Sequence, residues 1–275
     1  TKGVGLTSGY LYPGATYPYG MVQFTPSYFS KRSGFVINQL SGGGCEHMGN
    51  FPTFPVKGKL KMSPDNILNY RINISEEKGH AGYYEAKVQE DIHAKLTVTE
   101  RTGMASYEYP ADQQYGTVII GGGISATPIE QAAIVITAPN KCEGYAEGGN
   151  FCGLRTPYKV YFVAEFDTDA LESGTWKRNE LKPNTTFAEG EYSGVYFTFD
   201  VDKKKNVQYK IGVSYVSVEN ARENLKAENT GWDFLQIQNQ AESKWNHYLG
   251  KIEVEGTNPD RTTQFYTHLY RSFIH

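Results

Sequence analysis

Short stretches of apolar or alternating residues, separated by turn residues, recur from about residue 54 to residue 217. The alternation is clearest between Ile92 and Val98, where every even position is apolar and every odd position is polar. Successive side chains of a strand point to opposite faces, so this segment predicts a strand with one buried face. Other stretches with strand-like patterns are residues 69–74, 83–88, 105–109, 117–120, 133–137, 159–166, 195–200 and 207–216.

So many strands without helices between them predict an all-β fold, a large antiparallel β-sandwich of the supersandwich type. The period becomes helical after Ser217, which can cap a first helix. In a second helix, over about residues 234–248, apolar side chains recur every three or four positions, and Gly250 ends it. A short strand over residues 252–254 follows, and a third helix begins at Pro259.

These periods divide the chain into a sandwich domain over residues 1–218, a helical linker over residues 219–257 and a further helix over residues 258–275. Phe265 and Leu269 lie on the apolar face of that last helix, and this face has no obvious partner in the preceding sequence. Either the helix docks back on the sandwich, or it is the first helix of a second domain. We favour the second interpretation, in which the remainder of that domain is absent from the chain.

Composition excludes several classes of function. Lysine and arginine total 27 against 30 for aspartate and glutamate, a formal net charge of −3, so no strongly basic surface is available for nucleic acid. No apolar stretch approaches the roughly 20 residues that a membrane-spanning helix needs. The 21 tyrosines and 29 glycines favour a turn-rich β protein. The chain opens at Thr1 without an apolar signal segment, which favours an exported protein whose leader was removed, or a trimmed sequence.

Three cysteines cannot all pair within one chain. Cys142 and Cys152 flank a glycine-rich segment and could form a disulfide across a hairpin, whereas Cys45 stands alone after three glycines. Two arrangements stay open, a bridge between Cys142 and Cys152 or three free thiols, because sequence gives no Cα separation.

Two segments near the N-terminus carry the strongest functional signal. Tyr12–Pro26 contains Pro-Gly-Ala and Leu40–Pro52 contains Ser-Gly-Gly-Gly-Cys, and both resemble the start of glycoside hydrolase family 92, the calcium-dependent exo-acting α-mannosidases. Residues 216–225 and 265–271 resemble that family's linker helices and the entry to its catalytic domain. The resemblance covers both ends of the chain in the family's order, whereas residues 59–215 match only as a pattern of strands.

The resemblance implies that the parent protein is an inverting α-mannosidase acting on mannose-containing glycans, N-glycans among them. It also implies that an (α/α)6 barrel begins near residue 258 and holds the general acid, the general base and the calcium ligands. We therefore expect no catalytic residue and no metal ligand in this chain, and no activity from it alone. Its partners would be the mannose-containing glycan and its own C-terminal catalytic domain. A free-standing carbohydrate-binding or adhesion module is the alternative, and a secreted or periplasmic location is expected.

The residues expected to contact the sugar are Gly44, Cys45, Glu46, His47, Gln39 and Arg32. In the family, the glycine-rich loop faces the cleft that holds mannose, and glycine lets backbone N–H groups approach a ligand closely. An inverting glycosidase needs two carboxyl groups about 6.5–9.5 Å apart, so Glu46 alone is a substrate contact and not a catalytic pair. Gln39 stands where the family usually has histidine, and its amide can hydrogen-bond a hydroxyl but cannot titrate.

Overall fold

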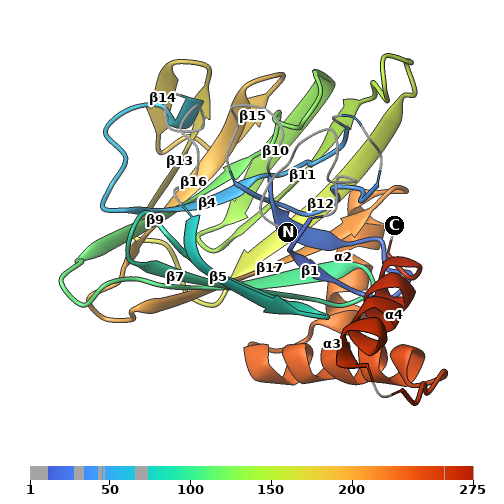
Figure 1. Cartoon of the computed structure of the whole chain (residues 1–275). Coiled ribbons are helices and arrows are strands. Elements are labelled where there is room, and N and C mark those ends of the chain that lie inside the picture. The colour runs from blue at the N-terminus through green and yellow to red at the C-terminus, as the bar shows by residue number, and fades with distance from the viewer. Residues whose placement is uncertain are drawn as a thin grey trace.

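The computed structural model describes residues 12–27, 34–42, 45, 47–65, 74–256 and 258–274. It confirms the predicted sandwich of two antiparallel sheets (Figure 1). The eight-stranded sheet has the order β1 (Ala15–Thr16), β2 (Gln23–Pro26), β3 (Phe35–Val36), β4 (Thr53–Lys57), β9 (Tyr115–Gly121), β16 (Ser193–Asp200), β13 (Glu172–Lys177) and β14 (Glu180–Pro183). The nine-stranded sheet has the order β15 (Phe187–Glu189), β10 (Ile129–Ala138), β11 (Lys141–Gly148), β12 (Tyr158–Phe166), β17 (Asn206–Ser214), β8 (Thr102–Glu108), β7 (Ile92–Val98), β6 (Tyr83–Val88) and β5 (Ile74–His80).

The core fills the space between the two sheets. All four even-numbered residues from Ile92 to Val98 are fully buried, as the alternation predicts. Phe166 of β12 joins the sheets, because its ring centroid lies 4.9 Å from that of Phe197 and 5.0 Å from that of Phe199, both on β16. Aromatic pairs at such distances stabilise a core beyond the effect of their buried area.

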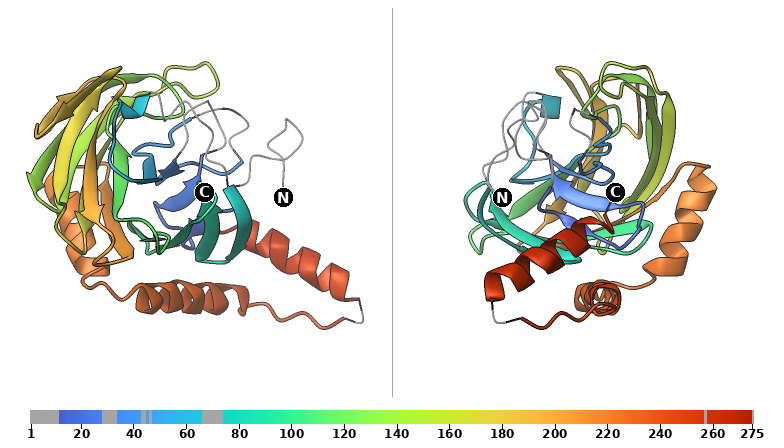
Figure 2. Two further views of the ribbon diagram at one scale, coloured as in Figure 1. Left: turned by 90° about the vertical axis from the view of Figure 1, so that its left-hand side faces the viewer. Right: turned by 45° about the vertical axis from the view of Figure 1, so that its right-hand side comes forward.

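The sequence patterns missed β1–β4, β11 and β13–β15, and they predicted one strand that does not form. The strand predicted over residues 69–74 lies outside the described residues except for Ile74. Gly144 of β11 reads as a turn residue, but a Cβ at this position would collide with the backbone oxygen of Ala133 on β10. The glycine therefore serves close strand approach rather than a turn. The predicted strand at residues 252–254 is wrong, because this segment belongs to a connection that leads away from both sheets (Figure 2). A strand there would have no neighbour to satisfy its backbone groups.

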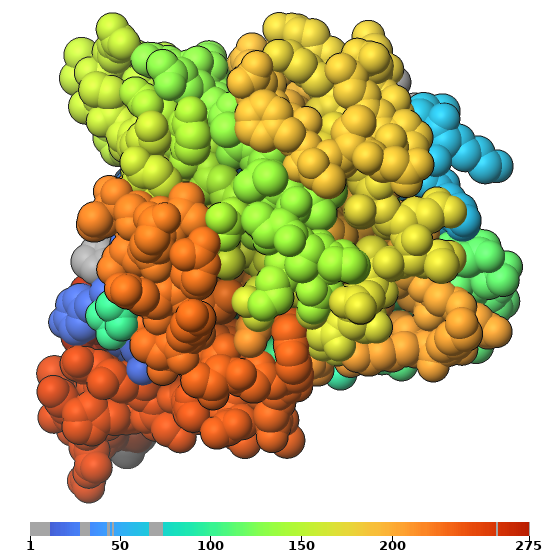
Figure 3. Space-filling model, turned by 180° about the vertical axis from the view of Figure 1, so that it is seen from behind, coloured from blue at the N-terminus to red at the C-terminus, as the bar shows by residue number. Residues whose placement is uncertain are grey.

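The three predicted helices form, each with a polar N-cap. They are α2 (Val218–Glu228), α3 (Phe234–Leu249) and α4 (Pro259–Arg271). As predicted, the Ser217 side chain accepts a hydrogen bond from the first turn of α2, and Pro259 is the first residue of α4. Seen from behind, the orange and red helical residues gather at the lower left of the molecule (Figure 3). None of the described helices is long and apolar enough to cross a membrane.

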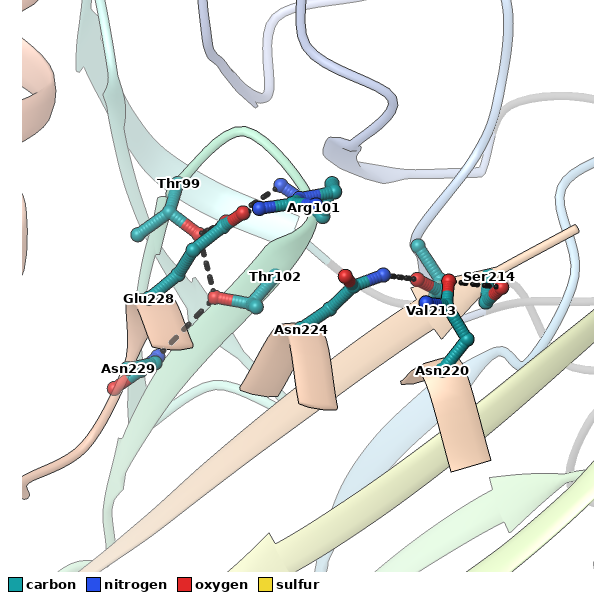
Figure 4. Close-up of polar contacts among 9 residues, drawn as sticks. All are labelled: Thr99, Arg101, Thr102, Val213, Ser214, Asn220, Asn224, Glu228 and Asn229. Carbon is teal, nitrogen blue, oxygen red and sulfur yellow. Dashed lines mark hydrogen bonds and ion pairs between the residues drawn. The ribbon is translucent and has the colours of Figure 1, made fainter. Parts of the chain in front are cut away.

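Polar side chains fix α2 to the nine-stranded sheet (Figure 4). The Glu228 carboxylate accepts hydrogen bonds from Thr99 Oγ1 at 2.6 Å and from the backbone N–H of Arg101 at 2.8 Å, and it also pairs with the Arg101 guanidinium. Asn224 Nδ2 donates to the Val213 carbonyl at 2.8 Å. Gly212 allows this close packing, since a Cβ there would meet α2. The end of the sandwich and the start of the helical segment are therefore one packed unit.

A buried lysine holds the connection between α2 and α3. Lys210 Nζ donates to the Asn229 carbonyl at 3.0 Å and lies 4.4 Å from the ring centroid of Trp232. Glu165 Oε2 lies 3.7 Å from the same ammonium group. The carbonyl, the aromatic face and the carboxylate offset the cost of burying the ammonium group. Because two of these partners belong to the connection, Lys210 holds the connection against the sheet.

The C-terminal end of α4 packs against α3 and β1. The Trp245 and Tyr270 ring centroids lie 4.4 Å apart, Trp245 Nε1 donates to the Thr16 carbonyl at 2.7 Å, and the Tyr270 hydroxyl lies 2.7 Å from Thr16 Oγ1. No residue between Pro259 and Arg271 is buried. The domain boundaries at residues 218 and 258 stay a prediction.

Candidate substrate-binding loop

The candidate loop, residues 38–50, connects β3 to β4 at one end of the eight-stranded sheet. Of the predicted site residues, Gln39, Cys45 and His47 are described, whereas Arg32, Gly44 and Glu46 lie outside the described residues. Gln39 and His47 are both buried. The roles expected for these residues stay predictions, and the described ones can be examined by their contacts.

One hydrogen bond brings Gln39 and His47 together. Gln39 Nε2 donates to the His47 carbonyl oxygen at 3.0 Å. Gly49 makes room for the same amide, because a Cβ there would lie 2.9 Å from Gln39 Oε1 and the glycine has a φ of +70°. A side chain at this position would therefore be both crowded and strained. The local sequence thus requires glycine beside the glutamine.

The His47 ring has a defined tautomer. Its Nδ1 lies 2.6 Å from the Cys45 carbonyl oxygen, which can only accept, so Nδ1 carries a proton. In the neutral ring, Nε2 is then a hydrogen-bond acceptor. Among the described residues this buried Nε2 has no hydrogen-bond partner, and the same holds for Gln39 Oε1. Two acceptors of the loop are therefore left without donors.

A network of asparagine and tyrosine side chains supports the base of the loop. Asn38 Nδ2 donates to Asn50 Oδ1 at 3.0 Å, and the Asn50 backbone N–H donates to Asn38 Oδ1 at 2.7 Å. The Tyr158 hydroxyl donates to Asn50 Oδ1 at 2.9 Å, and the Tyr215 hydroxyl lies 3.4 Å from Asn38 Nδ2. Burial raises the pKa of Tyr158 to about 12, so its hydroxyl stays protonated at neutral pH.

Sequence reasoning missed this network, and its only local signal is a pair of asparagines at the two ends of the loop. Asn50 Nδ2 is buried and has no acceptor among the described residues. Each unpaired buried group costs about 1–3 kcal/mol. Within the described part of the loop, two acceptors and one donor are therefore buried without a partner, and a hydroxyl group, which both donates and accepts, has the chemistry to match either kind.

A disulfide joins the loop to the connection between β11 and β12. Cys45 and Cys152 are bonded, with Cα atoms 5.4 Å apart, whereas Cys142 is a free, buried thiol. Both arrangements expected from sequence are thus wrong. Cys142 lies within β11, opposite Ala164 of β12, and its side chain belongs to the core, so it cannot reach Cys152 beyond the strand's end.

The disulfide brings an aromatic side chain to the loop. The Phe151 ring centroid lies 4.9 Å from that of His47. Sequence analysis gave no role to Phe151, because nothing in a sequence relates residue 151 to residue 47 without the cysteine pairing. The signal that could have found it is the correct partner of Cys45.

A small cavity of about 20 Å³ lies where the base of the loop meets the end of the described chain. Gln39 and Ile274 both line it. A larger groove of about 780 Å³ runs along α3 from Asp233 to His247, and no predicted site residue lines it. The described residues contain no group of three or more histidine, cysteine, aspartate or glutamate side chains arranged to hold a metal ion.

Comparison with known proteins gives the same assignment for both parts of the chain. Residues 1–214 match the model of the glycosyl hydrolase family 92 N-terminal domain, and residues 220–275 match that of the family's catalytic domain. An uncharacterized secreted glycosidase from Arthroderma benhamiae is 26% identical over 97% of this chain and 40% of its own length.

Solved structures of the same family share the fold. A family 92 glycosyl hydrolase has a TM-score of 0.84 at 22% identity, over 97% of this chain and 39% of its own. A family 92 α-mannosidase from Bacteroides thetaiotaomicron has a TM-score of 0.81 at 24% identity, over 97% and 39%. A family 92 inverting mannosidase from the same bacterium has a TM-score of 0.80 at 24% identity, over 97% and 37%. The present chain thus spans about two fifths of its relatives' length.

Proposed function

Because this chain belongs to glycosyl hydrolase family 92, as the match of residues 1–214 shows, we propose that its parent protein is an exo-acting α-mannosidase whose 38–50 loop binds the terminal mannose. The observation that carries the proposal is the match of both parts of the chain to the family's models. Three buried polar groups of the loop without a partner among the described residues, Gln39 Oε1, His47 Nε2 and Asn50 Nδ2, support it. A sugar hydroxyl donates to the two acceptors or accepts from the amide donor.

The proposal divides the work between two parts of the protein. The loop residues orient the sugar, while the acid and base lie in the part of the protein that this chain does not contain. The presence of Gln39 and Ile274 in the lining of one small cavity supports this division. Ile274 belongs to the segment that matches the catalytic-domain model, so the loop and that segment border the same cavity.

The reaction would be an inverting hydrolysis of α-mannosides. A general acid protonates the leaving oxygen while a general base activates water on the opposite face of the sugar. Calcium, which the family resemblance implies, has no fitting set of ligands among the described residues, so we assign it to the remainder of the protein and derive no step through it.

An exported location agrees with the disulfide between Cys45 and Cys152, because such bonds persist in oxidising compartments. We therefore propose that the protein is secreted or periplasmic. The similarity to a glycosidase described as secreted supports this location.

The experiment compares the 275-residue chain with the protein extended to the length of its relatives. Hydrolysis of α-mannobiose by the longer protein, with β-mannose as the first product in NMR spectra, is the expected result. The short chain should neither hydrolyse it nor bind mannose measurably in calorimetry. Tight mannose binding by the short chain without hydrolysis by either protein would favour the free-standing carbohydrate-binding module instead.

A further inference from the structure

The segment between β11 and β12 contains a tight two-residue turn. Phe151 and Leu154 exchange backbone hydrogen bonds, with N···O distances of 2.8 and 2.9 Å. The residues between them, Cys152 and Gly153, have φ angles of +52° and +85°. Positive φ at both central positions is the geometry of a type I′ hairpin turn. This conformation is uncommon for cysteine, so surrounding contacts must hold it.

Two covalent or ionic ties hold the turn. Cys152 is bonded to Cys45 of the candidate loop, and the Arg155 guanidinium makes two hydrogen bonds to the Glu130 carboxylate, at 3.2 and 3.0 Å. Asn150 Oδ1 also accepts a hydrogen bond from the Gly153 backbone N–H at 2.9 Å. The disulfide therefore ties the turn to the loop, and the ion pair ties it to β10.

The turn presents two apolar side chains beside the loop. Residues directly opposite in an antiparallel pair have their side chains on the same face, which applies to Phe151 and Leu154. Phe151 is 37% exposed and Leu154 is 71% exposed. The ring of Phe151 also contacts the His47 ring, so one end of this apolar pair adjoins the loop and the other extends to the surface.

Exposure increases from His47 through Phe151 to Leu154, and the polar imidazole is followed by two apolar side chains. Under the proposed function, the terminal sugar binds at the loop. The part of the substrate beyond the cleaved bond must extend outward, where it would meet the apolar pair. The face of a pyranose ring that carries C–H groups packs well on an aromatic or aliphatic side chain.

We propose that Phe151 and Leu154 form the wall that contacts the leaving-group sugar of the substrate, and that the Cys45–Cys152 disulfide sets the position of this wall. This inference rests on the proposed α-mannosidase function. It assigns a specificity-determining role to a segment that lies 107 residues from the loop in sequence. The wall would favour substrates whose leaving group is a sugar over those with a small alkyl leaving group.

The test uses the full-length protein and two substrates, α-mannobiose and methyl α-mannoside. We expect Phe151→Ala to lower kcat/KM for α-mannobiose about tenfold, equivalent to about 1.4 kcal/mol, while kcat/KM for methyl α-mannoside stays within about twofold of the wild-type value. Leu154→Ala, at a more exposed position, should change kcat/KM in the same direction and by less. Phe187→Ala is the matched control, because Phe187 is an exposed phenylalanine on β15, away from the turn, and its loss should alter neither substrate.

Two results would overturn the inference while leaving the proposed function intact. One is wild-type selectivity between the two substrates in both the Phe151 and Leu154 variants. The other is an equal loss on both substrates, which would place Phe151 against the mannose itself. Failure of the wild-type protein to hydrolyse any α-mannoside would instead overturn the proposed function and the inference with it.

Discussion

Gln39 and His47, eight positions apart in sequence, are joined by the hydrogen bond from Gln39 Nε2 to the His47 carbonyl oxygen. The bond closes the glycine-rich loop on itself. It also brings together Gln39 Oε1 and His47 Nε2, neither of which has a partner in the described part of the chain. The same two residues thus supply the bond that holds the loop together and two buried acceptors.

The first prediction follows from this bond. Gln39→Leu keeps much of the side-chain volume but leaves the His47 carbonyl unpaired, so the free energy of unfolding should fall by about 1–3 kcal/mol. In the full-length protein, kcat/KM on α-mannobiose should fall about tenfold or more, because the loop loses both the hydrogen bond to the His47 carbonyl and the Gln39 acceptor. Urea unfolding and steady-state kinetics measure the two effects. Gln131→Leu, at an exposed position of β10, is the control, and equal behaviour of the two variants would remove Gln39 from the site.

The second prediction concerns the disulfide. Cys152→Ser should lower the free energy of unfolding by about 2–4 kcal/mol, because the bond closes a long stretch of chain. It should also raise KM for α-mannobiose, since the Phe151 turn loses its tie to Cys45. Thiol titration checks the pairing: native wild-type protein should expose no reactive thiol, and after mild reduction two should react while buried Cys142 does not. Reaction of Cys142 before Cys45 would contradict the assignment.

The third prediction tests the polar contacts that fix α2. Glu228→Gln keeps the shape of the side chain but removes the charge that binds the Arg101 backbone N–H, the Arg101 guanidinium and the Thr99 hydroxyl. We expect a loss of about 1–2 kcal/mol in the free energy of unfolding, since Arg101 is partly exposed and solvent weakens its share. Glu223→Gln, on an exposed position of the same helix, should have no measurable effect. Equal stabilities of the two variants would show that α2 does not depend on this carboxylate.

The fourth prediction is a pH dependence. Burial lowers the pKa of Lys210 below its usual 10.5, with Glu165 opposing and Lys141 adding to the shift. A lysine whose pKa is lowered on folding destabilises the folded state while it is charged, and this cost disappears as the pH rises through the lowered pKa. Relative to Lys210→Met, the wild-type protein should therefore gain stability between neutral pH and about pH 10. Urea unfolding at several pH values measures this. If the difference in free energy of unfolding between the two proteins is the same at neutral pH and at about pH 10, the lowered pKa is contradicted.

The sequence predicted the elements whose pattern is local. The alternation from Ile92 to Val98, the cap at Ser217 and the helix start at Pro259 each depend on neighbouring residues, and all three were confirmed. β11 was missed because Gly144, which is needed for close approach to β10, has the local signature of a turn. Local patterns do not contain the identity of a neighbouring strand.

The candidate site was predictable only in part, for a related reason. The glycine-rich loop is contiguous in sequence, so motif reasoning could point to Cys45 and His47. The residues that complete it, Tyr158 and Phe151, come from the opposite sheet's strands and connections. Their positions depend on how the two sheets pack, which no short-range pattern encodes.

The disulfide has a consequence for how the chain matures. Cys45 follows β3 of one sheet and Cys152 follows β11 of the other, so the packing of the two layers holds these two thiols together in the folded chain. Cys142 lies ten positions before Cys152 and competes with it in the unfolded chain, until formation of β11 buries its thiol. Oxidation before that strand forms would trap a mispaired chain, detectable by mass spectrometry of peptides joined through Cys142. Formation of β11 before thiol oxidation therefore favours the correct pairing, because it removes Cys142 from the competition.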